Sequence, residues 1–201
     1  MAHLVGQERA LYVQDMFTRI AGNYDLMNRL MTAGQDVTWR RYVIHQAQLP
    51  LDGRLLDIAT GTGEIALEGL ALVPGLQAVG GDFTVEMMQV GRQIPVRRAI
   101  RWVGADTLAL PFPDDYFDAV TSGFLMRNVI DVHKAFSEQM RVLKPGGRVV
   151  VLESSPPKRF RHPYSGPSGG RRCRRLSLPA GQHAAVPRSS FPGCRHAPGR
   201  V

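Results

Sequence analysis

The chain has 201 residues and is 44% hydrophobic, enough for one domain with a packed core, and no apolar run approaches the roughly 18 residues of a membrane-spanning helix. The formal net charge of +8 lies at one end, because residues 159–201 contain nine Arg and no Lys, Asp or Glu; subtracting their +9 leaves −1 for residues 1–158. Because no membrane-spanning run and no secretory hydrophobic segment is present, we expect a cytoplasmic protein. The body is nearly neutral, we expect no specific nucleic-acid partner, and two isolated cysteines, Cys173 and Cys194, predict neither a disulfide framework nor a metal site.

Helical patterns occupy the first part of the chain. Apolar residues at helical spacing predict three helices, over residues 7–20, 24–32 and 36–49. Pro50, Asp52 and Gly53 then end the helical region and turn the chain.

The stretch 55–67, LLDIATGTGEIAL, organises the rest of the chain. Residues 55–58 predict a short buried strand, residues 60–63 a tight glycine turn, and residues 64–72 a helix. Glycines let a ligand approach the backbone closely, and the first turn of a helix offers free N–H groups. A strand, a glycine turn and a helix in this order therefore predict a site for a nucleotide-like ligand.

Four more apolar strands are predicted after this unit, at residues 76–81, 100–104, 117–122 and 148–153, and helices are predicted at residues 84–93 and 131–143. Near-continuous apolar strands that alternate with helices predict an α/β fold with a doubly wound parallel sheet. Ligands of such folds bind at the carboxyl ends of the strands. Asp82, Asp106 and the glycine turn all fall at such ends.

The acid inside the first strand discriminates between cofactors. Gly61-x-Gly63-x-x-Ala66 also fits a dinucleotide-binding fingerprint, and Asp82 could hold ribose hydroxyls in either case. Asp57 lies four residues before Gly61, and an acid at this place resembles the pattern of class I S-adenosylmethionine (SAM) methyltransferases. The alternative for Asp57 is a carboxylate that only caps the turn.

The resemblance implies a Rossmann-like methyltransferase core over residues 51–158, with SAM as cofactor. It implies that Asp57 orients the glycine loop and the methionine end of the cofactor, that Asp82 binds the ribose, and that Asp106 lies beside the adenine. The cofactor-binding residues that it implies are Asp57, Gly61, Thr62, Gly63, Asp82, Asp106, Thr107 and Gly123.

Two stretches resemble signatures of the menaquinone/ubiquinone-biosynthesis C-methyltransferases. The first is YDLMN at residues 24–28, with Thr32, Gly34 and Trp39 after it; the second is RVLKPGG at residues 141–147, which continues to ESS at residues 153–155. Phe124 and RNV at residues 127–129 match between them, and the resemblance covers about residues 12–158. The chain departs from the family pattern at three positions, Thr32 for Ser, Asp36 for His and Gly123 for Ser.

The family methylates a ring carbon of a polyprenylated quinol, so the resemblance implies this substrate. It implies Arg127 as the partner of a substrate phenolate, with Tyr24 and Asn128 positioning the ring, and residues 1–50 as a helical lid on the substrate side. The alternatives are an Arg127 that pairs with Asp131 and a Tyr24 that only packs. A prenyl tail implies peripheral contact with the inner face of the cell membrane; the oligomeric state and the choice between naphthoquinol and benzoquinol stay open.

The composition changes abruptly at residue 159. Arg, Gly, Pro, Ser and His make up 29 of the last 43 residues, which predicts a disordered basic tail without the antiparallel strand pair that normally ends this fold. Residues 174–188 can be back-translated so that a frame shifted by one nucleotide spells DAYPYLPASTLQFLA, which resembles the family's segment after strand 5. We therefore expect an out-of-frame tail; a real basic tail for nucleic acid or anionic lipid is the rival. For the whole chain, a methyltransferase for another small molecule and an inactive truncated product also stay open.

Overall fold

The computed structural model of the chain describes residues 6–153 and 186–187. Its centre is a six-stranded sheet in the order β3-β2-β1-β4-β5-β6. The first five strands are parallel, as predicted, and β6 runs antiparallel to β5. The strands are β1 (Arg54–Ile58), β2 (Gln77–Asp82), β3 (Arg101–Gly104), β4 (Phe117–Gly123), β5 (Leu143–Leu152) and β6 (Val186–Pro187). The chain moves outward from β1 to β3 and then returns to β4, so the direction of winding reverses between β1 and β4.

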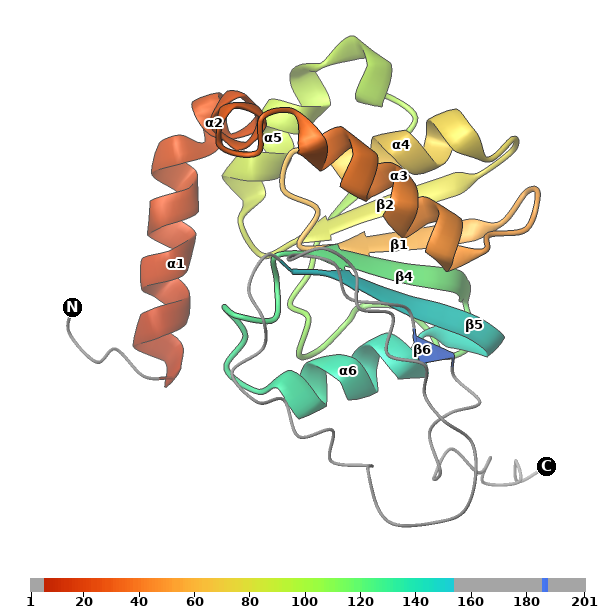
Figure 1. The fold of residues 1–201 in the computed structure, drawn as a ribbon. Helices are drawn as coiled ribbons and strands as arrows, with labels where there is room; N and C mark the ends of the chain where they lie inside the picture. Colours follow the sequence, from red (N-terminus) through yellow and green to blue (C-terminus); the bar gives the residue numbers. More distant parts are fainter. Residues whose placement is uncertain (1–5, 154–185, 188–201) are drawn as a thin grey trace.

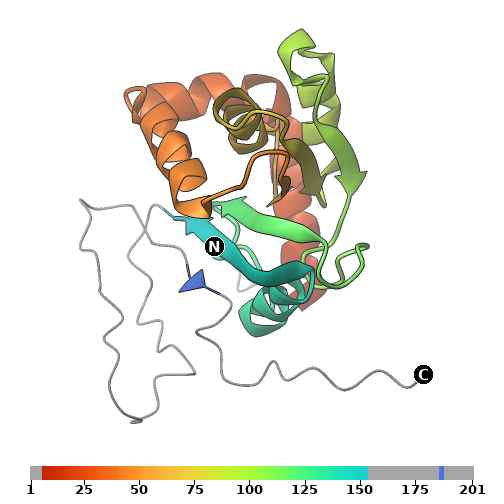
Figure 2. The same cartoon turned by 90° about the vertical axis from the view of Figure 1, so that its right-hand side faces the viewer.

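Helices cover both faces of the sheet (Figure 1). Helices α3, α4 and α5 lie on one face and α6 lies on the other, and the view turned by 90° agrees (Figure 2). Helices α1 and α2, which we call the lid helices, lie beside the carboxyl ends of the strands. The helices are α1 (Gly6–Ile20), α2 (Tyr24–Met31), α3 (Gln35–Ala47), α4 (Glu64–Leu72), α5 (Val85–Gln93) and α6 (Val132–Arg141), with short 3₁₀ turns η1 (Ala21–Asn23) and η2 (Pro95–Arg97).

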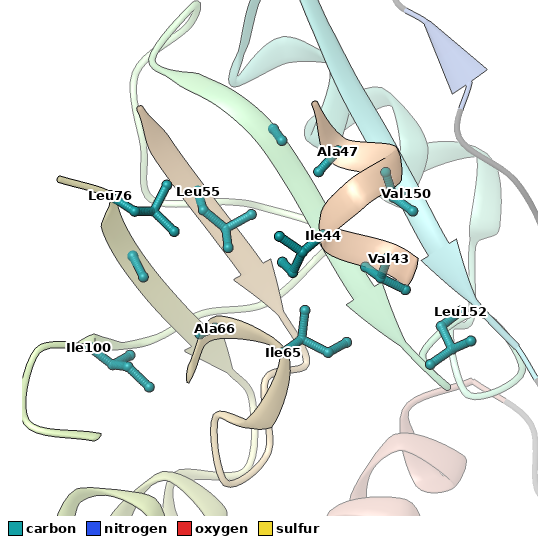
Figure 3. Packing of buried hydrophobic residues seen from close by; sticks show 12 residues of the cluster. Val43, Ile44, Ala47, Leu55, Ile65, Ala66, Leu76, Ile100, Val150 and Leu152 are labelled. Carbon is teal, nitrogen blue, oxygen red and sulfur yellow. The ribbon is translucent and has the colours of Figure 1, made fainter. Parts of the chain in front are cut away.

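Each face of the sheet has its own apolar core. Leu55 of β1 packs with Ile44 of α3 and Val150 of β5, and Figure 3 shows this cluster at close range. The next residue, Leu56, points to the opposite face and packs in the cluster that contains Met140 of α6. Both leucines are fully buried, and each such side chain stabilises the fold by about 1.5–3 kcal/mol. Burial on both faces explains why the strand is apolar without alternation.

The helical region differs from the predicted lid over residues 1–50. Helix α3 packs on the sheet through Val43, Ile44 and Ala47, all buried, and it contacts α4 and β5. Because the apolar side chains of α3 face the sheet, α1 and α2 are the described helices of this region that stay available for the predicted lid.

Two further corrections concern the end of the described chain. β5 begins at Leu143 and not at residue 148, because Leu143 already pairs with Phe117 before a register shift in the ladder. Val186 and Pro187 form β6 in the part of the chain expected to lack strands. Val186 pairs with Val149 of β5, so backbone groups that would be unpaired at an open sheet edge have hydrogen-bonding partners. The predictions of a disordered, out-of-frame tail otherwise lie outside the described residues.

Within residues 6–153 and 186–187, no helix combines the length and the apolar character needed to cross a membrane. The same residues contain no group of three or more His, Cys, Asp or Glu side chains that could hold a metal ion.

Candidate functional site

A cleft of about 180 Å³ lies at the carboxyl ends of β1, β2 and β4, and α1 closes one of its sides. Its position is the point where the winding of the sheet reverses, the usual ligand site of doubly wound folds. Polar groups come from Gln14, Tyr24, Asp82, Thr84, Asp106, Thr107 and Asn128. Apolar side chains, among them Phe17, Phe83, Met87, Leu108 and Phe124, form much of the remaining wall.

The glycine turn after β1 uses its two glycines for different purposes. Gly61 lines the cleft at φ +57°, and a Cβ there would lie 3.3 Å from Cε of Met87. Gly63 adopts φ +91° and does not line the cleft; a Cβ there would lie 2.5 Å from the ring of Trp102. Gly61 therefore keeps space at the ligand side of the turn, whereas Gly63 lets the turn pack against β3.

Asp57 lies behind the turn and not in the cleft. Its carboxylate is buried and accepts hydrogen bonds from Oγ1 of Thr60 at 2.6 Å and from Oγ1 of Thr121 at 2.8 Å. Burial, the largest cause, raises the pKa of Asp57 to about 6 despite these bonds and a further one from the backbone of Ala66. The carboxylate thus joins the glycine turn to β4 and orients the loop from outside the cleft.

Asp82 ends β2 and lines the cleft. One oxygen accepts the N–H of Gly61 at 2.7 Å and the other accepts the N–H of Thr84 at 2.7 Å. The side chain is nearly buried, and this burial raises the pKa of Asp82, partly offset by the backbone donors around it. Its carboxylate therefore fixes the glycine turn and still presents acceptor capacity to the cleft.

The predicted adenine side also lies on the cleft. Asp106 is exposed, and its Oδ1 accepts the N–H of Leu108 at 2.9 Å. Thr107 follows it on the cleft wall, with the buried side chain of Gln139 behind; Nε2 of Gln139 lies 3.4 Å from Oγ1 of Thr107. Gly123, at the end of β4, lines the cleft as well.

Two of the three predicted catalytic residues line the cleft. Tyr24 comes from α2 and packs edge-on against Phe17 of α1 at 5.8 Å, and Asn128 comes from the loop after β4. Arg127 is exposed and does not line the cleft; its guanidinium lies 5.0 Å from the ring centroid of Phe124. Phe124 itself lines the cleft, so Arg127 lies at the rim.

Thr62 has a role that the sequence did not indicate. It does not line the cleft; its Oγ1 donates to Oδ1 of Asp25 at 2.6 Å, and its carbonyl accepts from Arg97 at 2.9 Å. Arg97 is buried and also pairs with Asp25 and Glu64. These partners lie far apart in the sequence, so no spacing rule could have joined them.

Backbone strain also marks the cleft. Ala59 and Phe124 adopt φ +56° and +57°, a left-handed conformation that non-glycine residues rarely adopt, and both line the cleft. They follow β1 and β4, the two strands at the reversal of winding. No pattern in the sequence signals this, because neither residue type favours the conformation.

The strand order, the glycine turn after β1 and a ligand cleft at the β1/β4 junction define a Rossmann-like α/β fold, which a SAM-dependent methyltransferase of Methanococcus maripaludis shares with a TM-score of 0.59. The chain belongs to the ubiE/COQ5 methyltransferase family, whose model matches residues 4–165.

Curated relatives agree with this family, and a solved structure shares the fold. The chain is 46% identical over 153 residues to the ubiquinone/menaquinone biosynthesis C-methyltransferase UbiE of Desulfotalea psychrophila, which covers 76% of the chain and 62% of that relative. It is 49% identical over 144 residues to the demethylmenaquinone methyltransferase of Thermus thermophilus, with 71% and 66% covered. The crystal structure of the YcgJ protein of Bacillus subtilis is similar with a TM-score of 0.54 and 32% identity, over 60% of this chain and 53% of that one. The chain thus spans about two thirds of the length of these curated relatives.

Proposed function

We propose that the chain binds SAM in the cleft and methylates a ring carbon of a polyprenylated quinol, either demethylmenaquinol or the corresponding ubiquinone precursor. The observation that carries the proposal is the cleft at the β1/β4 junction, lined by Asp82 and Asp106 in a chain of this family. The names of the relatives, which refer to menaquinone and ubiquinone biosynthesis, support the substrate class.

The residues of the cleft fit the chemical groups of SAM. Asp82 offers a carboxylate for ribose hydroxyls, and Thr107 with Asp106 offers polar contacts for an adenine. Apolar side chains such as Met87 and Leu108 suit the faces of that ring. Asp57, Thr62 and Gly63 act from behind the turn and keep it in shape. When bound, SAM supplies an electrophilic methyl group on a sulfonium.

The substrate side must orient a ring carbon and favour a phenolate. Exact orientation supplies much of the rate of such a displacement, and exclusion of water strengthens every electrostatic contact inside the site. Tyr24 reaches the cleft from α2 and Asn128 reaches it from the loop after β4, so the two side chains are suited to hold the ring between them. We infer that Arg127, at the rim, stabilises the substrate phenolate, because a guanidinium stabilises developing negative charge.

The lid helices offer an apolar surface for a prenyl tail. Six of the twelve exposed large apolar side chains that the described residues contain lie on α1 and α2. They are Leu11, Tyr12, Met16, Leu26, Met27 and Leu30. Exposed apolar side chains gathered in this way favour contact with a lipid-like ligand or a membrane surface, in line with peripheral membrane contact.

The proposal is tested in two measurements on the full chain. Calorimetry with SAM should show one binding site, and transfer of a labelled methyl group should then proceed to demethylmenaquinol or to a benzoquinol. Methylation of one ring type fixes the substrate. Binding without transfer to either quinol would favour another small-molecule acceptor, and absence of binding would favour an inactive chain.

A further inference from the structure

One carboxylate joins the lid helices to the glycine turn. Oδ1 of Asp25, in the first turn of α2, accepts the hydroxyl of Thr62 at 2.6 Å, and Oδ2 lies 3.1 Å from the guanidinium of Arg97. We call these three residues the Asp25 latch. The side chain of Asp25 is 34% exposed, whereas that of Arg97 is 5% exposed, so the contact lies at the inner border of the lid.

The partners of Asp25 are themselves fixed. Arg97 donates to the carbonyl of Thr62 at 2.9 Å and pairs with Glu64, the first residue of α4. Glu64 also pairs with Arg40 of α3. Asp25 therefore binds to a rigid group that belongs to the cofactor side of the cleft, while its own helix belongs to the lid.

Tyr24 lies next to the latch on the same helix. Tyr24 precedes Asp25, and its Cε1 lies 4.0 Å from the place that a Cβ at Gly61 would occupy. A helix held at Asp25 therefore keeps the ring of Tyr24 over the glycine turn, on the wall of the cleft.

We propose that Asp25 is a positioning residue: through Thr62 and Arg97 it holds α2 on the glycine turn and so assembles the substrate side of the cleft next to the cofactor. The inference rests on the proposed function for its kinetic consequences, but not for its structural ones. Gly61 stays bound to Asp82 when the latch opens, so loss of the latch weakens capture of the quinol more than it weakens binding of SAM.

Two substitutions of Thr62 separate the latch from simple packing. Thr62→Val keeps the shape of the buried side chain and removes its hydroxyl, whereas Thr62→Ser keeps the hydroxyl and removes a methyl group. Hydrogen exchange of α2 in the full chain should rise about tenfold in the Val variant, because this variant loses a hydrogen bond to a charged group. The Ser variant should stay within about threefold of the unmodified chain. The reverse order, or equal exchange in both variants, would overturn the proposal.

Kinetics give a second, independent readout. Asp25→Ala should raise KM for the quinol about tenfold and leave the Kd of SAM, measured by calorimetry, within about threefold. The matched control is Asp15→Ala, which removes the same charge from an exposed pair with Arg19 on α1 and should leave both values unchanged. Equal effects of the two variants would overturn the latch. If the unmodified chain binds no SAM, the proposed function fails, and the exchange experiment still decides the latch.

Discussion

The two sides of the cleft are built differently. On the sheet side, Asp57 and Asp82 are largely buried and hold the glycine turn through short bonds to backbone N–H groups and hydroxyls. On the lid side, α1 and α2 expose many apolar side chains, and the two latch contacts of Asp25 bind α2 to the turn. Substitutions at the turn should therefore affect folding, whereas substitutions on the lid should affect the ligand.

The largest effect is expected at Gly63. Gly63→Ala forces a Cβ to within 2.5 Å of the Trp102 ring and strains a residue at φ +91°. Strain of about 1–2 kcal/mol and overpacking of about 1–3 kcal/mol together predict a loss of about 2–5 kcal/mol in the free energy of unfolding. Urea denaturation measures it. Gly146→Ala is the control, with φ +85° and open space around it, and should lose only the strain.

The buried acid Asp57 should make stability depend on pH. Burial raises its pKa from 3.8 to about 6, so the folded chain binds this proton more tightly than the unfolded chain. The resulting stabilisation is complete below pH 3.8 and is lost as the pH rises through about 6, a difference of about 3 kcal/mol at most.

Denaturation of the unmodified chain and of Asp57→Asn at several pH values measures this effect. We subtract the free energy of unfolding of the variant from that of the unmodified chain. This difference should fall between pH 4 and pH 7, because only the unmodified chain has the titrating Asp57 carboxyl group. A difference that rises or stays flat over this range would contradict the assignment.

A smaller effect is expected on the cofactor. Asp82→Asn leaves one of two backbone donors without its carboxylate oxygen, so the affinity for SAM should fall about tenfold. The exposed Asp106 accepts a backbone bond from Leu108, and Asp106→Asn should weaken binding less, by about threefold. Calorimetry with both variants checks the order, and a larger loss from Asp106→Asn would speak against it.

The smallest effect on folding is expected on the lid. Leu30 is 72% exposed on α2, so Leu30→Ser should change the free energy of unfolding by less than about 0.5 kcal/mol. KM for a long-chain quinol should nevertheless rise severalfold, while KM for a short-chain analogue stays constant. Leu51→Ser, at a comparably exposed site outside the lid, is the control and should change neither KM. An equal rise for both chain lengths would exclude contact between Leu30 and the tail.

The sheet was predictable from the sequence because its signals are local. Apolar runs placed all five parallel strands, and the helix over residues 64–72 was predicted with its exact bounds. The start of β5 at Leu143 was not predictable, since Lys144-Pro145-Gly146-Gly147 favours a turn and pairing with Phe117 overrides this preference. Likewise β6 depends on a partner strand and not on its own two residues.

The candidate site was predictable where the place of a residue at a strand end is enough to put it on the cleft. Asp82, Asp106 and Gly61 line the cleft because each lies at the carboxyl end of its strand or within three residues after it. Thr62 and Gly63 belong to the same motif, yet their partners Asp25 and Trp102 come from distant parts of the chain. Such contacts between distant segments depend on the assembled fold, and a single sequence contains no spacing that reveals them.

The left-handed backbone at Ala59 has a consequence for engineering. An L-residue in this conformation destabilises the folded chain by about 1–2 kcal/mol, and glycine avoids that cost. Glycine also makes the unfolded chain more flexible, which destabilises the folded chain by about 0.5–1 kcal/mol. Ala59→Gly should therefore make the chain slightly more resistant to heat. The same change removes a methyl group from the wall of the cleft, so thermal resistance and a well-shaped ligand surface are in competition at this residue.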